Sequence, residues 1–296
     1  MRLGKHYIDL SIPRVMGILN ATPDSFSDGG RLQSETHSGG FSVSVDRALF
    51  LAEGMLRDGA AIIDVGGEST RPGALPVSEQ EELDRVIPVV EAITARLDVA
   101  VSVDTSTPAV MVRAIAAGAG LINDVRALGC EGAKGIVARS AAAACLMHMR
   151  GQPENMQDHV EYNNVVDEVY AFLKQRVAMC EQEGIARDRL LIDPGFGFGK
   201  TLAHNYELLR HLGRLQSLKL PILVGLSRKS MIGSLLNKGV DQRLAGGVAA
   251  TVHALLNGAV IVRTHDVAET VDAIKVHCAV VKAQSETVWL TGNGRE

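Results

Sequence analysis

Polar and ionisable residues follow short apolar runs throughout this sequence, and their side chains could line one binding pocket. The residues in these positions are Asn20, Asp64, Asp104, Asn123, His148, Asp193, Ser227, Arg228, Lys229, Arg263 and His265. A single aspartate after a strand commonly does no more than cap the next helix. Buried Asp, Lys and Arg are rare unless they are paired, however. So many of them in equivalent positions therefore favour a pocket.

The carboxylates, amide and amine of this set suit a flat, nitrogen-rich ring. Asp104 and Asp193 accept hydrogen bonds when ionised, Asn123 both donates and accepts, and Lys229 only donates. The N–H edges of a heterocycle need such acceptors. His148 has no evident partner in the sequence and is interpreted as a core residue or as a support behind the site.

Two further residues of the set, Arg263 and His265, predict an anion site. A guanidinium binds phosphate oxygens through two parallel hydrogen bonds, and the imidazole adds another. Together with the acceptors, they indicate a phosphorylated heterocycle as the substrate class. The alternative is a surface ion pair with Asp266, which follows His265 directly.

The glycine-rich stretch at residues 193–201 (DPGFGFGKT) does not match a nucleotide-binding motif. A P-loop needs glycine where Pro194 stands, and a dinucleotide-binding loop needs it where Lys200 stands. The stretch is predicted to be a tight loop that presents Phe198. No Ser-His-Asp or Cys-His nucleophile pattern is evident.

The polar residues require elements that bring them together, and the apolar runs have the length of strands buried on both faces. The runs are Arg14–Leu19, Ala60–Val65, Val99–Val103, Gly120–Val125, Ala144–Met149, Leu190–Asp193, Pro221–Leu226 and Ala259–Val262. Helical patterns lie between them at Val45–Asp58, Glu79–Leu97, Pro108–Ala117, Val160–Glu183, Asn205–Leu215 and Gly246–Leu256.

Helix boundary signals support this division of the chain. Ser78 and Glu81 have capping-box spacing, and Pro108 stands at a first helical position. Glycines that tolerate a positive φ follow four predicted helices, at Gly59, Gly118, Gly184 and Gly258. The alternation predicts one (β/α)8 TIM-barrel domain over residues 1–296, in which the polar residues meet at the carboxyl ends of the strands. A doubly wound open sheet is the alternative.

Composition narrows the class of protein. The 296 residues are 46% hydrophobic and 22% charged, with a net charge of −4 and 4% aromatic residues. These values argue against a nucleic-acid partner. The four cysteines lie far apart, and the most apolar stretch, residues 245–262, is interrupted by polar residues. We expect a soluble, cytoplasmic protein with no signal peptide and no membrane partner.

Taken together, seven ordered motifs over about residues 13–280 closely resemble the dihydropteroate synthases of folate biosynthesis. The matching segments are Met16–Gly30, Asp64–Gly73, Ser102–Thr105, Ile122–Val125, Asp193–Lys200, Gly225–Gly233 and Arg263–Val267. The chain departs from the family at Ala21, where valine is usual, and at Arg31–Phe41, which is longer than usual. Both departures affect loops rather than the residues assigned to chemistry.

The resemblance implies a TIM-barrel transferase that joins 6-hydroxymethyl-7,8-dihydropterin pyrophosphate to p-aminobenzoate, releasing 7,8-dihydropteroate and pyrophosphate. It implies that the pterin contacts Asp104, Asn123, Asp193 and Lys229, and the pyrophosphate Asn20, Arg263 and His265. It implies that p-aminobenzoate contacts Phe26, Thr70, Arg71, Pro72, Phe198 and Ser230. Mg²⁺ bridging Asn20 to the phosphates and a homodimer are implied in the same way.

The resemblance also implies an SN1-like path, in which pyrophosphate leaves before the arylamine attacks. Asp104, Asp193, Lys229, Arg263 and His265 are then the catalytic residues. The two alternatives are a pterin-dependent methyltransferase and a non-catalytic pterin-binding module. Retention of Asn20, Arg71, Lys229, Arg263 and His265 argues against the latter.

Overall fold

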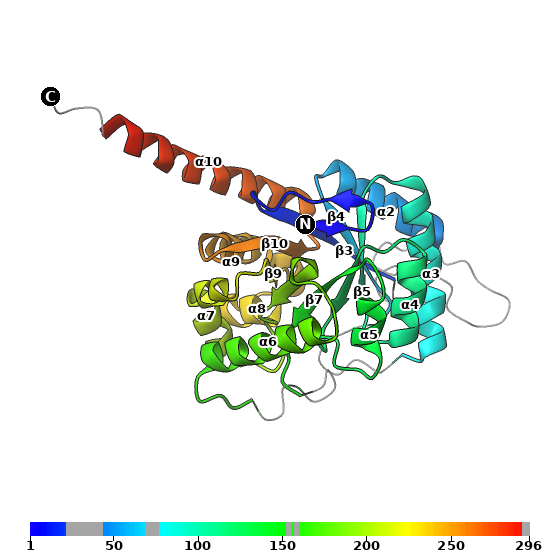
Figure 1. The fold of residues 1–296 in the computed structure, drawn as a ribbon. Helices are drawn as coiled ribbons and strands as arrows, with labels where there is room; N and C mark the ends of the chain where they lie inside the picture. The colour runs from blue at the N-terminus through cyan, green and yellow to red at the C-terminus, as the bar shows by residue number, and fades with distance from the viewer. Residues whose placement is uncertain (22–43, 69–76, 152–155, 157–159, 292–296) are drawn as a thin grey trace.

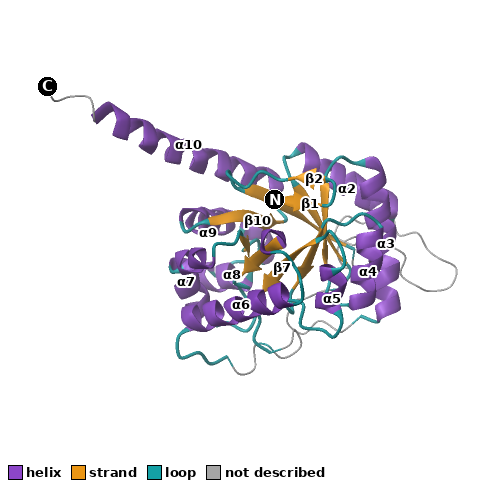
Figure 2. Ribbon diagram, viewed as in Figure 1, coloured by secondary structure: helices purple, strands orange, loops and turns teal. Residues whose placement is uncertain are grey.

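Eight parallel strands close into a barrel in the order β10-β3-β4-β5-β6-β7-β8-β9 (Figures 1 and 2). The computed structural model describes residues 1–21, 44–68, 77–151, 156 and 160–291, with side chains to residue 283. The barrel strands are β3 Arg14–Asn20, β4 Ile62–Gly66, β5 Ala100–Asp104, β6 Leu121–Asp124, β7 Ala143–Met147, β8 Leu190–Asp193, β9 Ile222–Gly225 and β10 Ala259–Thr264. The closed barrel confirms the predicted fold and rules out the open sheet.

Helices surround the barrel, as Figure 2 shows. They are α2 Val45–Arg57, α3 Glu79–Arg96, α4 Pro108–Ala116, α5 Ala133–Ala138, α6 Val165–Gln182, α7 Leu202–Arg210, α8 Ser230–Leu236, α9 Leu244–Leu256 and α10 Val267–Thr291. The described residues also form the 3₁₀ helices η1 Arg187–Arg189 before β8, η2 Leu212–Leu218 before β9 and η3 Val240–Gln242 before α9.

Most predicted helix boundaries are confirmed to within a few residues. Ser78 Oγ accepts a hydrogen bond from the Glu81 amide at 3.3 Å, and the four glycines named above all have positive φ. The sequence missed α5 and α8, which are too short to show a helical period, and also α10. The predicted helix over 205–215 divides into α7 and η2, because His211 leaves helical geometry.

The amino-terminal end of the barrel is filled with apolar side chains. Met16, Ile62 and Leu121 lie fully buried inside it. A short hairpin of β1 (Arg2–Leu3) and β2 (His6–Tyr7), which the sequence did not reveal, adds Leu3 to this cluster. A Cβ on Gly120 would lie 2.3 Å from the Leu3 carbonyl carbon, so the hairpin packs directly on the start of β6. Polar side chains are therefore left to the opposite end.

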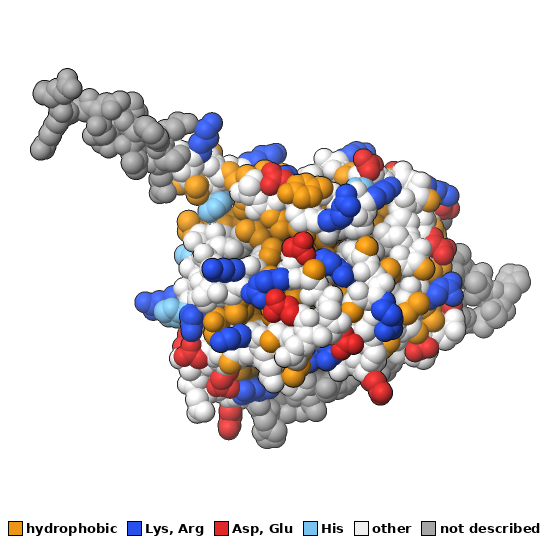
Figure 3. All heavy atoms as spheres, viewed as in Figure 1, with side chains coloured by type: hydrophobic (Ala, Val, Ile, Leu, Met, Phe, Trp, Pro, Cys, Tyr) orange, Lys and Arg blue, Asp and Glu red, His pale blue; other side chains and the backbone are white. Residues whose placement is uncertain are grey.

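Helix α10 projects beyond the barrel in Figure 1. Within the described part of the chain, none of the helices has the length and apolar character needed to cross a bilayer. On the face drawn in Figure 3, acidic and basic side chains are interspersed.

Candidate active site

The register of the sheet places several predicted site residues in one row at the barrel mouth. Asn20 of β3 pairs with Gly66 of β4, Gly66 with Asp104 of β5, and Asp104 with Asn123 of β6. A Cβ on Gly66 would lie 3.5 Å from the Asp104 Cβ and 3.9 Å from Asn20 Oδ1. The absence of a side chain at Gly66 thus opens the space between these two polar groups.

Arg263 of β10 joins this row through two carboxylates. Its Nε donates to Asp64 Oδ2 at 2.6 Å and its Nη2 donates to Asp104 Oδ2 at 2.7 Å. Asn123 Nδ2 donates to the same Asp64 oxygen at 3.1 Å. Arg263 is therefore bonded directly to Asp104 and is linked to Asn123 through Asp64. Asp64, to which the sequence assigned no role, connects them.

The alternative ion pair between Arg263 and Asp266 is wrong. Asp266 Oδ1 instead accepts from Arg228 Nη2 at 2.6 Å. Ser227 Oγ lies 3.1 Å from His265 Nδ1 and donates to Asp266 Oδ2 at 3.2 Å, so Ser227 bridges the two residues. Ser227 was among the polar residues predicted for the pocket, two residues beyond the end of β9, although the sequence assigned it no individual role.

Burial changes the proton affinities of the groups around Arg263. It raises the pKa of Asp104 to about 7, against the opposing attraction of Arg263, because ionised carboxyls are poorly solvated there. The neighbouring Asp64 carboxylate adds to this rise. Although burial disfavours its charge, Asp64 and Asp104 raise the pKa of Arg263. The arginine therefore stays cationic in the pocket.

Asp193 and Lys229 form the opposite side of the mouth. Asp193 Oδ1 accepts from the Gly195 amide at 2.7 Å, and burial raises the pKa of Asp193 while Lys229 opposes that rise. Burial lowers the pKa of Lys229 to about 8, although Asp193 favours its charge. Lys229 Nζ donates to the Phe196 carbonyl and lies 4.7 Å from the centre of the Phe198 ring. Phe198, which is predicted to contact p-aminobenzoate, thus lies next to Lys229, which is predicted to contact the pterin.

The glycine-rich loop after β8 needs its glycines for close packing. Gly195 and Gly199 have φ of +66° and +59°. A Cβ on Gly195 would lie 1.9 Å from the His148 carbonyl oxygen, and one on Gly199 would lie 2.4 Å from the Arg150 carbonyl oxygen. The prediction of a tight loop is confirmed. His148 lies behind this loop, 4% exposed, consistent with its interpretation as a support.

The structure describes two of the remaining predicted site residues. Asn20 is half-buried at the end of β3, and Ser230 is exposed at the first residue of α8, directly after Lys229. Four residues assigned to p-aminobenzoate fall outside the described residues, namely Phe26, Thr70, Arg71 and Pro72.

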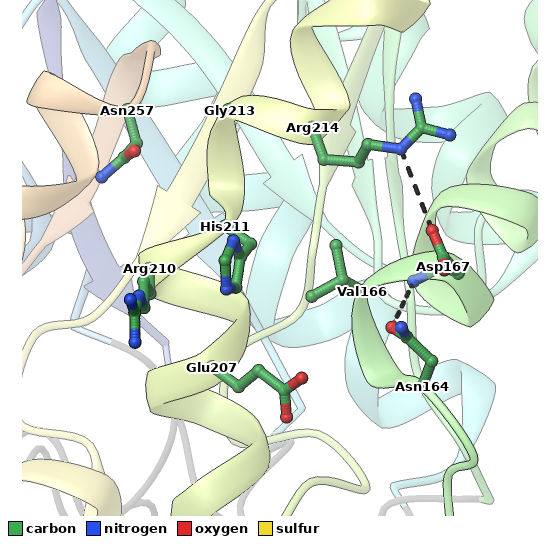
Figure 4. Close-up of a pocket in the computed structure, with 9 residues that line it drawn as sticks. All are labelled: Asn164, Val166, Asp167, Glu207, Arg210, His211, Gly213, Arg214 and Asn257. Atoms are coloured by element: carbon green, nitrogen blue, oxygen red, sulfur yellow. Dashed lines mark hydrogen bonds and ion pairs between the residues drawn. The ribbon is translucent and has the colours of Figure 1, made fainter.

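A separate hollow of about 400 Å³ lies among the outer helices (Figure 4). Its lining comes from α6, α7, η2 and the end of α9, and includes Asp167, Arg210 and Arg214. Arg214 Nε lies 3.9 Å from Asp167 Oδ1. None of the residues predicted for the site lines this hollow.

Comparisons with known proteins agree with the geometry of the mouth. The family model described as "Pterin binding enzyme" matches residues 16–265. Dihydropteroate synthase of Escherichia coli K12 is 53% identical over 277 residues, which cover 94% of this chain and 95% of that protein. The corresponding protein of Haemophilus influenzae is 51% identical, with 93% and 97% covered.

Solved structures give the same result. A Yersinia pestis dihydropteroate synthase in a sulfonamide complex superposes with a TM-score of 0.88 at 52% identity, covering 95% of this chain and 99% of that one. The Xanthomonas albilineans dihydropteroate synthase in complex with 7,8-dihydropteroate has a TM-score of 0.81 at 47% identity, with 92% and 95% covered.

Proposed function

The chain belongs to the dihydropteroate synthase family of pterin-binding enzymes, and we propose how its residues divide the work of that transferase reaction. The enzyme condenses 6-hydroxymethyl-7,8-dihydropterin pyrophosphate with p-aminobenzoate, releasing 7,8-dihydropteroate and pyrophosphate. The observation that carries the assignment of roles is the meeting of Asp104, Asn123 and Arg263 in one hydrogen-bonded group at the barrel mouth.

The pterin ring is bound by Asp104, Asn123, Asp193 and Lys229. The carboxylates accept from the N–H edge of the ring, while Asn123 and Lys229 donate to its acceptors. This proposal is supported by the burial of Asp193 and Asn123, at 6% and 5% exposure, because a shielded carboxylate gains more from each hydrogen bond.

The pyrophosphate is bound by Arg263, His265 and Asn20. Arg263 uses two of its N–H groups on Asp64 and Asp104, which leaves three of its five donors for phosphate oxygens. His265 follows β10 directly, and the contact of its Nδ1 with Ser227 Oγ orients the ring for a hydrogen bond to the leaving group. Charge that develops on the pyrophosphate is stabilised by the fixed positive charge of Arg263 and by hydrogen bonds from the other two residues.

Asn20 would hold Mg²⁺ together with phosphate oxygens and water. The residues present fit this ion, because Asn20 offers an amide oxygen at the open, glycine-lined end of β3, and Mg²⁺ needs few protein ligands when phosphates supply the rest. Among the described residues there is no cluster of three His, Cys, Asp or Glu for a metal held by protein alone. The ion would neutralise charge on the leaving pyrophosphate.

The carbon–oxygen bond to pyrophosphate breaks first, and the resulting pterin cation is stabilised by Asp104 and Asp193. The amine of p-aminobenzoate then attacks the methylene carbon, forming the new carbon–nitrogen bond, and its excess proton passes to solvent. Phe198 and Ser230 contact the arylamine, with Phe26, Thr70, Arg71 and Pro72 assigned to the same substrate by resemblance. The path needs no strong general base.

We place the reaction in the cytoplasm.

A second copy of the chain is proposed to cover an apolar groove of about 430 Å³ between α7, α8 and α9. Leu235 and Leu236 line this groove although they are 59% and 41% exposed, so they present apolar surface to a second copy. Light scattering is expected to give twice the chain mass. Leu235→Asp should give monomer, whereas Val112→Asp, at an exposed side chain of α4, should not change the mass.

The function is tested by mixing the pterin pyrophosphate, p-aminobenzoate and Mg²⁺ and measuring pyrophosphate and dihydropteroate together. The two products should appear in equal amounts. Binding of the pterin without turnover would indicate a binding module. Methyl transfer from a methylated pterin, without condensation, would indicate the methyltransferase.

A further inference from the structure

Lys200, at the end of the glycine-rich loop, is a buried cation for which the reaction above has no use. It is 2% exposed. Its Nζ donates to the carbonyl oxygens of Gly195 at 2.8 Å and Phe198 at 3.0 Å, and lies 2.9 Å from His148 Nδ1. Burying a lysine is unfavourable unless its ammonium is fully hydrogen-bonded. The His148 carbonyl oxygen is a fourth, more distant acceptor at 3.4 Å. These acceptors occupy the three N–H groups of the ammonium, so none remains for a phosphate.

His148 accepts the hydrogen bond from Lys200 when the lysine is an ammonium. Burial lowers the pKa of Lys200, whereas the charge of Asp193 favours the ammonium. An ammonium has no acceptor, so in that form His148 Nδ1 carries the lone pair and the ring proton lies on Nε2. Burial, helped by the charge of Lys200, lowers the pKa of His148 to about 2, which keeps the ring neutral. The ring also packs edge-on against Phe172, with centroids 4.9 Å apart. His148 is therefore a rigid acceptor at the end of β7.

The loop that Lys200 holds contributes to both proposed substrate sites. The carbonyl of Phe196 accepts from Lys229 Nζ, and the ring of Phe198 lies against the same amine. On its other side the loop is held by Asn205, whose Oδ1 accepts from the Gly197 amide at 2.7 Å. The position of Phe198 thus depends on its own carbonyl bond to Lys200.

We propose that Lys200 is a positioning residue for the arylamine site, which ties the Gly195 and Phe198 carbonyls to His148 and so presents the Phe198 ring to p-aminobenzoate. The proposal rests on the proposed function, because it takes Phe198 as an arylamine contact. Lys200 does not touch either substrate. The charge of Lys200 also favours the ionised form of Asp193, so Lys200 affects the pterin site only by this electrostatic interaction.

The first test is Lys200→Met, which keeps the length of the side chain and removes the ammonium. We expect the KM for p-aminobenzoate to rise about tenfold or more and that for the pterin pyrophosphate to change less than about threefold, because Lys229 still has Asp193 as its counterion. The acidic limb of kcat/KM should move to higher pH, since Asp193 loses a nearby cation. Lys174→Met, at an exposed position of α6, is the matched control and should behave as wild type.

A pair of variants at His148 tests the same contact without removing the charge. The Oδ1 of His148→Asn can replace Nδ1 as the acceptor, so its KM for p-aminobenzoate should stay within about threefold of wild type. His148→Leu removes the acceptor and should raise that KM as Lys200→Met does. If Lys200→Met does not fold, this pair decides the question.

The outcomes separate the inference from the function on which it rests. A wild-type enzyme that releases no pyrophosphate would overturn the proposed function. An active wild type whose variants raise both KM values equally, or lower only the melting temperature, would overturn the positioning role. Equal p-aminobenzoate KM values for His148→Asn and His148→Leu would overturn it as well.

Discussion

The two sides of the barrel mouth hold their charges in different ways. On the β4–β5–β10 side, Arg263 bonds directly to the carboxylates of Asp64 and Asp104, with one cation for two anions. On the β8–β9 side, Lys200 and Lys229 accompany the single carboxylate of Asp193, and their hydrogen bonds go mainly to backbone carbonyls. The first side is held by ion pairs between strands, and the second by a loop wrapped around ammonium groups.

Because of this difference, the two sides should be sensitive to different substitutions. A buried ion pair that loses one partner leaves a charge without compensation, so the arginine side should respond strongly to single charge substitutions. The lysine side depends on loop carbonyls that need glycine conformations at 195 and 199. It should therefore respond to changes in loop shape and proton affinity.

The largest expected effect comes from removing the shared cation of the first side. Arg263→Met leaves Asp64 and Asp104 buried without it, and kcat/KM should fall about 10³-fold through loss of charge stabilisation. The free energy of unfolding should fall by about 3 kcal/mol. Both the pterin pyrophosphate and the bare hydroxymethylpterin should bind more weakly in calorimetry. Unchanged binding of the bare pterin would show that Arg263 serves the anion alone. Lys275→Met, at an exposed pair, is the control.

On the second side, Asp193→Asn should weaken pterin binding about 100-fold, equivalent to about 3 kcal/mol, because an amide donor would face ring donors. The Asn oxygen can still accept from Gly195, so the loop should keep its shape. Isothermal calorimetry with hydroxymethylpterin measures the change, and Asp272→Asn on α10 provides a surface control. An unchanged dissociation constant would remove Asp193 from the pterin site.

The proton affinities of the two sides should together limit pterin binding. Asp104, with a pKa of about 7, must lose its proton to accept from the ring, so affinity should fall about tenfold from pH 8 to pH 6. Lys229, with a pKa of about 8, loses its charge above that pH, so affinity should fall again at higher pH. Asp104→Asn should remove the titration near pH 7 from the acidic limb, leave the titration of Asp193, and keep the alkaline limb. An acidic limb with an unchanged midpoint near pH 7 would exclude Asp104 as a source of it.

The smallest effect concerns stability in acid. His148 is neutral in the native state down to a pKa of about 2, whereas in the unfolded chain it gains a proton near pH 6.5. The unfolded state therefore binds more protons in this range, and stability is lost as the pH falls below 6.5. The contribution is about 1 kcal/mol between pH 6.5 and 5.5. Urea unfolding of wild type and His148→Asn at both pH values measures it. Equal pH dependence would show that His148 is protonated in the fold.

Much of the fold was readable because it depends on local patterns. Runs such as Leu190–Asp193 became strands with their predicted bounds, since a strand buried on both faces is continuous in sequence and apolar throughout. The hairpin at Arg2–Tyr7 escaped prediction because each of its strands has two residues, and only contact with the barrel makes it ordered.

By itself, the sequence determined which residues stand at strand ends, and a barrel brings strand ends together whatever its details. It could not determine which of them pair, because that depends on side-chain reach across strands distant in sequence. Only the tertiary structure decided that Arg263 meets Asp64, 199 residues away, rather than Asp266, three residues away. It also decided that Lys200 turns inward to His148, because the ammonium satisfies loop carbonyls that water no longer reaches.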